Sequence, residues 1–162
     1  MRRGAPSIGD IAGMEAALCQ ARAGAVLEEV PVGAVVVRDG DIVGQAHNEM
    51  VRRRDPTAHA ELLAIQRALE RIESDRLPDA TLYVTLEPCA QCVGAIILAK
   101  VGRVIFGAYD RRCGMAGSVH DILRHPQLNH RPEVLGGMLA DECGQLLKGF
   151  FRARRPNSGA AS

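Results

Sequence analysis

The chain has few aromatic residues and no long apolar segment. Its 162 residues include no tryptophan, two tyrosines and three phenylalanines. No apolar stretch approaches the ~20 residues that a membrane-spanning helix needs. The two arginines in the opening MRRGAPSIGD are not followed by the apolar segment of a secretory signal. Tracts of Gly/Ser or Gln/Asn are also missing, so we expect neither membrane insertion, nor export, nor a disordered or fibrous chain.

The cysteines are also poorly suited to a disulfide framework. There are five of them, an odd number, and only Cys89 and Cys92 lie close together in the sequence. Small secreted domains that depend on disulfides carry more cysteines in paired spacings. The pattern therefore indicates a reducing, cytoplasmic compartment.

Charge is distributed unevenly along the chain. Residues 1–99 hold ten basic and fourteen acidic residues, a net charge of −4, whereas residues 100–162 hold ten and five, a net charge of +5. A basic second half is compatible with an acidic partner such as RNA. It is equally compatible with a solvated, solubilising face, and charge alone does not decide between the two.

Hydrophobic periodicity predicts helices at 10–28, with Asp10 as N-cap and Pro31 as terminator, and at 58–72. Between them, β-rich runs at 33–37 and 41–44 flank Arg38-Asp39-Gly40 and predict an antiparallel hairpin, and 48–57 is expected to be a loop. A strand at 81–85, a helix opened by Pro88 and a strand at 101–106 predict a parallel βαβ unit. Beyond it we expect irregular chain at 107–132 with a short helix at 119–123, an edge strand at 134–135 and a final helix at 139–151.

This order predicts a mixed sheet covered by helices. At 17.4 kDa and 47% hydrophobic residues, the chain fits one domain over 1–162, with its core at about 10–155 and flexible ends.

The chemistry is carried by two short motifs, Pro56-Thr57-Ala58-His59-Ala60-Glu61 and Glu87-Pro88-Cys89-Ala90-Gln91-Cys92. One imidazole and two thiolates make three ligands, the number that a catalytic zinc takes when its fourth position is kept for water. Cys89 and Cys92 are spaced i, i+3 at the start of a predicted helix, where the N-terminus also lowers the pKa of a thiol. His59 and Glu61 fit the same site if they lie in the first turn of their own helix.

Plainer interpretations exist for these motifs. Cys89 and Cys92 alone would suit a structural zinc knuckle or a redox pair beside a surface His-Ala-Glu, but the combination of both motifs favours a catalytic site. Cys113 is the one further cysteine near enough in sequence to be considered a fourth ligand. We expect it to be a bystander, because a fourth thiolate would close the position for water.

His-x-Glu followed by Pro-Cys-x-x-Cys is the signature of zinc-dependent nucleobase deaminases. Over about residues 10–155, the chain resembles more narrowly the bacterial tRNA-specific adenosine deaminases, of the cytidine deaminase-like superfamily. The runs that carry this resemblance are PVGAVVV, DPTAHAE, TLYVTLEPCAQC, GRVIFGAYD, MAGS, HPQLNHR and GGMLADECGQLLKGFFRARR.

The resemblance implies a cytidine deaminase-like three-layer α/β/α fold with a central mixed five-stranded sheet. It also implies one zinc ion per subunit, a homodimer, and deamination of adenosine to inosine at the wobble position of a tRNA anticodon. By the same resemblance, His59, Cys89 and Cys92 are the zinc ligands and Glu61 the proton shuttle. Asn48, Val32 and Ala60 match positions around the target base, and Asp110, Asn129, His130, Phe151 and Arg152 match positions that contact the anticodon stem-loop.

Each contact residue also has a structural alternative. Asn48 could be a turn residue, Val32 a core residue, and the RNA-contact positions loop caps or packing residues. The chain departs from the family in lacking tryptophan and in carrying His47 where an aromatic is expected. Rival functions are deamination of a free base such as guanine or cytosine, and a non-catalytic zinc subunit that presents tRNA, although Glu61 argues against the latter.

Overall fold

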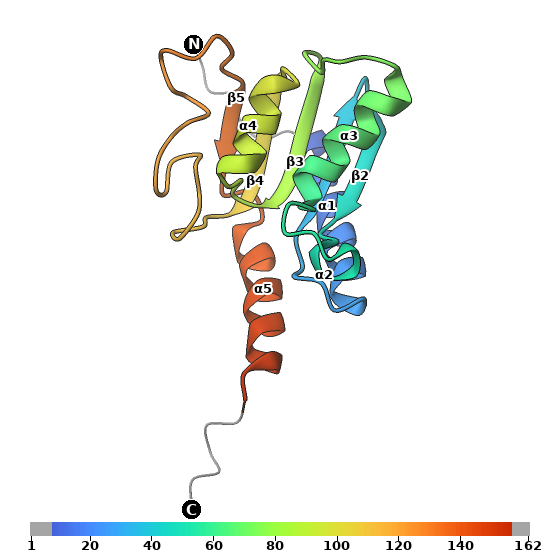
Figure 1. The fold of residues 1–162 in the computed structure, drawn as a ribbon, viewed down its shortest axis with the longest axis vertical. Coiled ribbons are helices and arrows are strands. Elements are labelled where there is room, and N and C mark those ends of the chain that lie inside the picture. Colours follow the sequence, from blue (N-terminus) through green and yellow to red (C-terminus); the bar gives the residue numbers. More distant parts are fainter. Residues whose placement is uncertain (1–7, 157–162) are drawn as a thin grey trace, which may run out of the picture.

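A computed structural model of the chain describes residues 8–156, and the flexible ends expected from the sequence fall mostly outside the described residues. The helices are α1 (Ile8–Val26), α2 (Met50–Arg53), α3 (Ala60–Ile72), α4 (Ala90–Leu98) and α5 (Ala140–Arg154). The strands are β1 (Gly33–Arg38), β2 (Asp41–His47), β3 (Ala80–Leu86), β4 (Arg103–Ala108) and β5 (Glu133–Gly136) (Figure 1). None of these helices is long and apolar enough to cross a bilayer.

The strands form one sheet in the order β2-β1-β3-β4-β5. β1 pairs antiparallel with β2 and β3, while β3, β4 and β5 are parallel. The predicted hairpin is confirmed, and its turn places Asp39 and Gly40 at φ of 51° and 81°. The predicted parallel βαβ unit is confirmed as β3-α4-β4.

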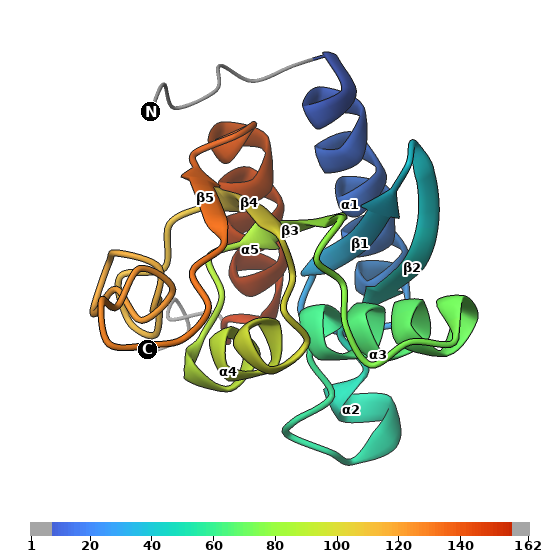
Figure 2. The same cartoon turned by 90° about the horizontal axis from the view of Figure 1, so that it is seen from above.

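Helices cover both faces of this sheet. Figure 2 shows α1 and α5 on one face and α3 and α4 on the other. The three-layer α/β/α architecture with a mixed five-stranded sheet is therefore confirmed.

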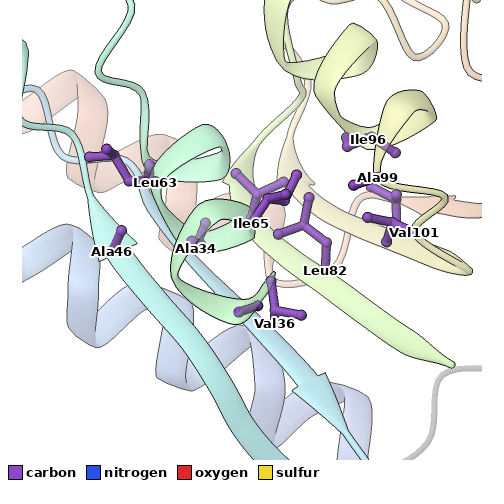
Figure 3. Close-up of a cluster of buried hydrophobic side chains, with 14 of the residues drawn as sticks. Ala34, Val36, Ala46, Leu63, Ile65, Leu82, Ile96, Ala99 and Val101 are labelled. Atoms are coloured by element: carbon purple, nitrogen blue, oxygen red, sulfur yellow. The ribbon is translucent and has the colours of Figure 1, made fainter. Parts of the chain in front are cut away.

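Small residues bring two of these helices close to the β1–β2 hairpin. A Cβ atom on Gly33 would lie 2.0 Å from the carbonyl oxygen of Ala17 in α1, and one on Gly44 would lie 2.3 Å from that of Ala64 in α3. Between the sheet and the α3–α4 layer, buried aliphatic side chains form the larger core cluster. Figure 3 shows part of this cluster, including Ala34, Val36, Ala46, Leu63, Ile65, Leu82, Ile96, Ala99 and Val101.

The first helix differs from its prediction at both ends. Asp10 lies inside α1 rather than capping it, and its buried carboxylate accepts hydrogen bonds from the Tyr83 hydroxyl (2.8 Å) and from Arg103 (2.5 and 3.0 Å). α1 ends at Val26, before Pro31, and the chain then turns through Glu28 at φ 62°. Asp10 therefore ties α1 to the sheet, a role that local sequence does not reveal.

Two loop predictions also need correction. Residues 48–57 contain the short helix α2, and the buried carboxylate of Glu29 accepts the backbone N–H groups of Val51 (3.1 Å) and Arg52 (2.7 Å) at its start. Residues 119–123 are not helical; instead an isolated bridge joins Ala116 to Asp121. In both places a contact with distant or neighbouring loop residues, rather than helical periodicity, decides the conformation.

The carboxyl ends of β2, β3 and β4 lie at one edge of the sheet, where α3 and α4 begin (Figure 1). Loops at this edge present side chains from several parts of the chain to one region, as is common in α/β proteins.

Candidate active site

The three predicted metal ligands meet at the carboxyl edge of the sheet. His59 is the N-cap of α3, Cys89 is the N-cap of α4, and Cys92 lies in the first turn of α4. Nδ1 of His59 lies 3.5 Å from the sulfur atoms of both Cys89 and Cys92. Pro88 precedes the N-cap and lies outside α4, so the prediction that it opens this helix is corrected. Two helix N-termini thus converge on one cluster of donor atoms.

The spacing of these donor atoms fits zinc. Zn–S bonds of about 2.3 Å and Zn–N bonds of about 2.0 Å at a tetrahedral angle require S···N separations of about 3.5 Å. The two observed separations are both 3.5 Å. Within residues 8–156, no other cluster of His, Cys, Asp or Glu side chains could hold a metal ion. Cys113 is exposed and lies outside this cluster.

The protein already stabilises a negative charge on one sulfur. Hydrogen bonds from the Cys92 thiol, and then from His59, lower the pKa of Cys89 to about 3. The hydrogen bond to the Cys89 thiolate is the largest cause that raises the pKa of Cys92, and burial is the second. For His59, the hydrogen bond to Cys89 is the largest cause that raises the pKa. The cluster therefore combines a thiolate, a thiol and an imidazole, the soft donor set that suits zinc.

Glu61 lies beside the cluster but is not part of it. It is the second residue of α3, it is 4% exposed, and its carboxyl group hydrogen-bonds the Cys92 thiol. Burial is the largest influence on this group and raises its pKa. A buried carboxyl group with a raised pKa, next to a candidate metal centre, is suited to accept and donate a proton in a reaction there.

The residues predicted to surround the target base also lie at the start of α3. The side-chain oxygen of Asn48 accepts a hydrogen bond from the backbone N–H of Ala60 (2.9 Å), and the N–H of Asn48 donates to the carbonyl of Val32 (3.1 Å). All three residues are buried, and Val32 and Ala60 belong to the core cluster. Asn48 is thus held rigidly next to His59.

A groove of about 1050 Å³ opens at the same edge, between the loop after β4 and the helix α5. Three predicted RNA-contact residues, Asp110, Phe151 and Arg152, line it. Phe151 is 50% exposed, and the guanidinium group of Arg154 lies 3.4 Å from the centre of the Phe150 ring. The basic side chains lining the groove are Arg111, Arg112, Lys148, Arg152, Arg154 and Arg155.

The side chain of Asp110 also caps its own loop. Its Oδ1 atom accepts the backbone N–H groups of Arg112 (2.9 Å) and Cys113 (3.2 Å). The structural alternative for Asp110, a loop cap, is therefore present, and Oδ2 takes part in neither of these two hydrogen bonds.

Asn129 and His130 are not brought to this groove. Asn129 accepts a hydrogen bond from Nζ of Lys100 (3.1 Å), and Nε2 of His130 lies 2.7 Å from the carbonyl oxygen of Val101. Lys100 and Val101 follow the C-terminal end of α4, whereas the predicted ligands Cys89 and Cys92 lie at its start. The contact of Asn129 and His130 with RNA stays a prediction.

Three residues at the site were not singled out by sequence reasoning. Glu87 and Glu29 are buried acids whose oxygens accept backbone N–H groups, and Tyr109 is a 57% exposed aromatic in the groove. The one local signal for Glu87 is a carboxylate placed directly between an apolar strand and Pro88. For Tyr109 it is an aromatic residue directly after an apolar strand, in a chain that has only five aromatic residues.

Comparisons with known proteins agree with this geometry. The profile of the MafB19-like deaminase family matches residues 9–155. A tRNA-specific adenosine deaminase of Bacillus subtilis (strain 168) is 43% identical over 148 residues, which cover 91% of this chain and 92% of that protein.

Two solved structures are also similar. One, from studies of A-to-I editing by tRNA:A34 deaminases at the wobble position of transfer RNA, has a TM-score of 0.80 and 40% identity, covering 84% of this chain and 99% of the other. A guanine deaminase from Bacillus subtilis has a TM-score of 0.60 and 28% identity, covering 93% and 96%. The chain belongs to the tRNA-specific adenosine deaminase family.

Proposed function

We propose that this protein hydrolyses adenosine to inosine, with release of ammonia, at the wobble position of a tRNA anticodon. The observation that carries the proposal is the juxtaposition, at one edge of the sheet, of a metal-ligand cluster, the buried Glu61 carboxyl and a basic groove. Two of the proteins named above, the tRNA-specific adenosine deaminase of Bacillus subtilis and the tRNA:A34 deaminase, support the same substrate.

His59, Cys89 and Cys92 would hold one zinc ion per subunit. When bound, zinc supplies a Lewis acid that lowers the pKa of water and so provides the nucleophile at neutral pH. Glu61 accepts the first proton of the attacking water and delivers it to N1 of the adenine ring. It then accepts the second proton from the new hydroxyl group at C6 and delivers it to the departing amino group, as the C6–N bond breaks and the carbonyl forms. The water thereby replaces the amino group, and inosine and ammonia are the products.

Asn48 and its neighbours hold the base. Because the protein engages the amide oxygen of Asn48, its NH2 group is the part that donates to an acceptor nitrogen of the purine. Val32 and the backbone of Ala60 form the wall beside it. A base that reaches this pocket must leave its stack, as in other enzymes that act on nucleobases.

The groove contacts the RNA around that base. Arg152 neutralises phosphate charge, the half-exposed Phe151 ring offers a stacking surface for an unpaired base, and Asp110 accepts hydrogen bonds from base edges or hydroxyls. For Asn129 and His130, the support for anticodon stem-loop contacts comes from the resemblance alone.

We further propose that residues 1–162 form a single deaminase domain that acts in the cytoplasm as a homodimer. The location follows from a tRNA substrate and from cysteines that are free in the structure.

A direct assay distinguishes this function from deamination of a free base. The zinc-loaded protein is incubated with unmodified tRNA, and separately with adenosine, cytidine and guanine, and the nucleosides are then separated by chromatography. We expect inosine only from tRNA and only at the wobble position. Inosine-free tRNA together with deaminated guanine or cytidine would overturn the proposal.

A further inference from the structure

Glu87 holds an entire loop by its side chain. The residue is 2% exposed and stands between the end of β3 and the ligand Cys89. Its Oε1 accepts hydrogen bonds from the backbone N–H of Asp110 (3.1 Å) and from the hydroxyl of Ser118. Its Oε2 accepts the backbone N–H groups of Ala116 and Ser118, both at 3.1 Å. All four donors come from the segment 110–118, which we call the wall loop.

Backbone contacts continue this attachment on both sides of Glu87. The N–H of Glu87 donates to the carbonyl of Ala108 (2.8 Å), and the N–H of Met115 donates to the carbonyl of Pro88 (2.9 Å). A Cβ atom on Gly114 would lie 2.3 Å from the Glu87 carboxylate, so the wall loop packs directly against it. The wall loop is therefore held against the short segment that leads into Cys89.

The wall loop forms one side of the basic groove. Its residues 110–113 line the groove opposite α5, and they include Asp110, whose backbone Glu87 holds directly. Glu87 thus connects the surface that faces the RNA to the start of the metal-bearing helix. No role in the chemistry follows, because each of its oxygens is engaged by the wall loop.

We propose that Glu87 is a positioning residue for RNA recognition, which sets the wall loop at the distance from the metal centre that a bound anticodon loop requires. This inference rests on the proposed function, since it presupposes an RNA in the groove. In this role, the buried Glu87 carboxylate aligns the wall loop with the metal centre, two surfaces that the RNA must contact together.

The chemistry of the four partners makes an exchange of Glu87 for glutamine a sharp probe. All four are N–H or O–H donors, which a carboxylate satisfies with its two oxygens. The amide of a glutamine has the same shape but directs NH2 hydrogens at two of these donors. The Ser118 hydroxyl can turn to accept one of these hydrogens, but at least one backbone N–H loses its acceptor, so the wall loop must shift while the core volume is kept.

The test is steady-state kinetics of Glu87→Gln with an anticodon stem-loop as substrate. We expect KM to rise about tenfold, kcat to stay within about threefold of wild type, and zinc content to remain one per chain. The matched control is Asp10→Asn, the same exchange at a buried carboxylate that binds Tyr83 and Arg103 near the opposite edge of the sheet. It should lower the melting temperature without changing KM. Glu70→Gln, on the exposed face of α3, should change neither.

A double-mutant cycle identifies the path of the effect. If Glu87 acts through the wall loop, then Glu87→Gln and Asp110→Ala together should raise KM by less than the product of their separate effects. Should Glu87→Gln fail to fold, Ser118→Ala removes the hydroxyl donor alone and should raise KM in the same direction by a smaller factor.

The outcomes separate this inference from the proposed function. A wild-type protein that forms no inosine in tRNA overturns both. An active wild type whose folded Glu87→Gln variant keeps its KM, or loses kcat alone, overturns only the role of Glu87, as does an unchanged KM in Ser118→Ala.

Discussion

The basic residues at the C-terminal end of α5 allow a quantitative test of whether RNA binds in the groove. Replacing Arg152, Arg154 and Arg155 together by alanine removes three of its positive charges. The packed side of α5 is untouched, since the residue that it buries is Cys143. Arg154 already lies over the Phe150 ring and donates to the carbonyl of Phe150 (3.2 Å), so its charge is held in place before RNA binds. We therefore expect weaker RNA binding without unfolding.

The size of the effect follows from counterion release. Each phosphate contact contributes about 0.7 to 0.9 to the slope of log affinity against log salt concentration, so three contacts contribute roughly 2 to 3. At about 0.15 M salt this corresponds to a loss of roughly 50- to 150-fold in affinity for a stem-loop.

Fluorescence anisotropy with a labelled anticodon stem-loop, measured at several salt concentrations, checks this expectation. The matched control is the triple alanine variant of Arg38, Arg71 and Arg76, which removes the same charge near the opposite edge of the sheet. If the α5 variant is folded and zinc-loaded but keeps the wild-type affinity and slope, or if the control variant loses as much, the groove is not where the RNA binds.

Four further expectations concern the candidate metal centre and the core. Glu61→Gln should retain one zinc per chain by metal analysis yet lose orders of magnitude in turnover, because the proton carrier is gone; Cys89→Ala should lose zinc and thermal stability together. Cys113→Ser should keep its zinc, and loss of metal would reveal a fourth protein ligand. Burial, and then Asp10, raise the pKa of Tyr83 to about 12. The stability that the neutral Tyr83 hydroxyl contributes is thus fully present below about pH 10 and is lost as pH rises toward 12. Because the chain has no tryptophan, tyrosinate absorbance of a Tyr109→Phe variant reports this ionisation, and a midpoint near 10 would contradict the buried network.

The parts that sequence reasoning predicted well depend on neighbours in the chain. The hairpin follows from the turn at Asp39-Gly40, and the metal cluster follows from ligands placed at the starts of two helices. The residues of this cluster could be predicted because His59, Cys89 and Cys92 occur in motifs that suit few functions other than binding a metal ion.

The parts that were missed depend on partners far away. Asp10 looks like a helix cap until Tyr83 and Arg103 are placed beside it, 73 and 93 residues along the chain. α2 is only four residues long, and its start is held by Glu29 from a preceding loop. Glu87 has no local sign of the wall loop that it binds. Buried carboxylates satisfied by backbone donors leave little periodic trace in a sequence.

The close contact between Gly44 and α3 has a consequence for which substitutions the site can tolerate. Ala64, whose carbonyl oxygen lies 2.3 Å from the place of a Gly44 Cβ atom, is one helical turn beyond Glu61. Any larger residue at position 44 would push α3 outward and carry His59 and Glu61 away from Cys89 and Cys92, which belong to another helix. The geometry of the metal centre is thus sensitive to a single methyl group on a strand that supplies no ligand, and inactive natural variants should be sought on the hairpin as well as among the ligands.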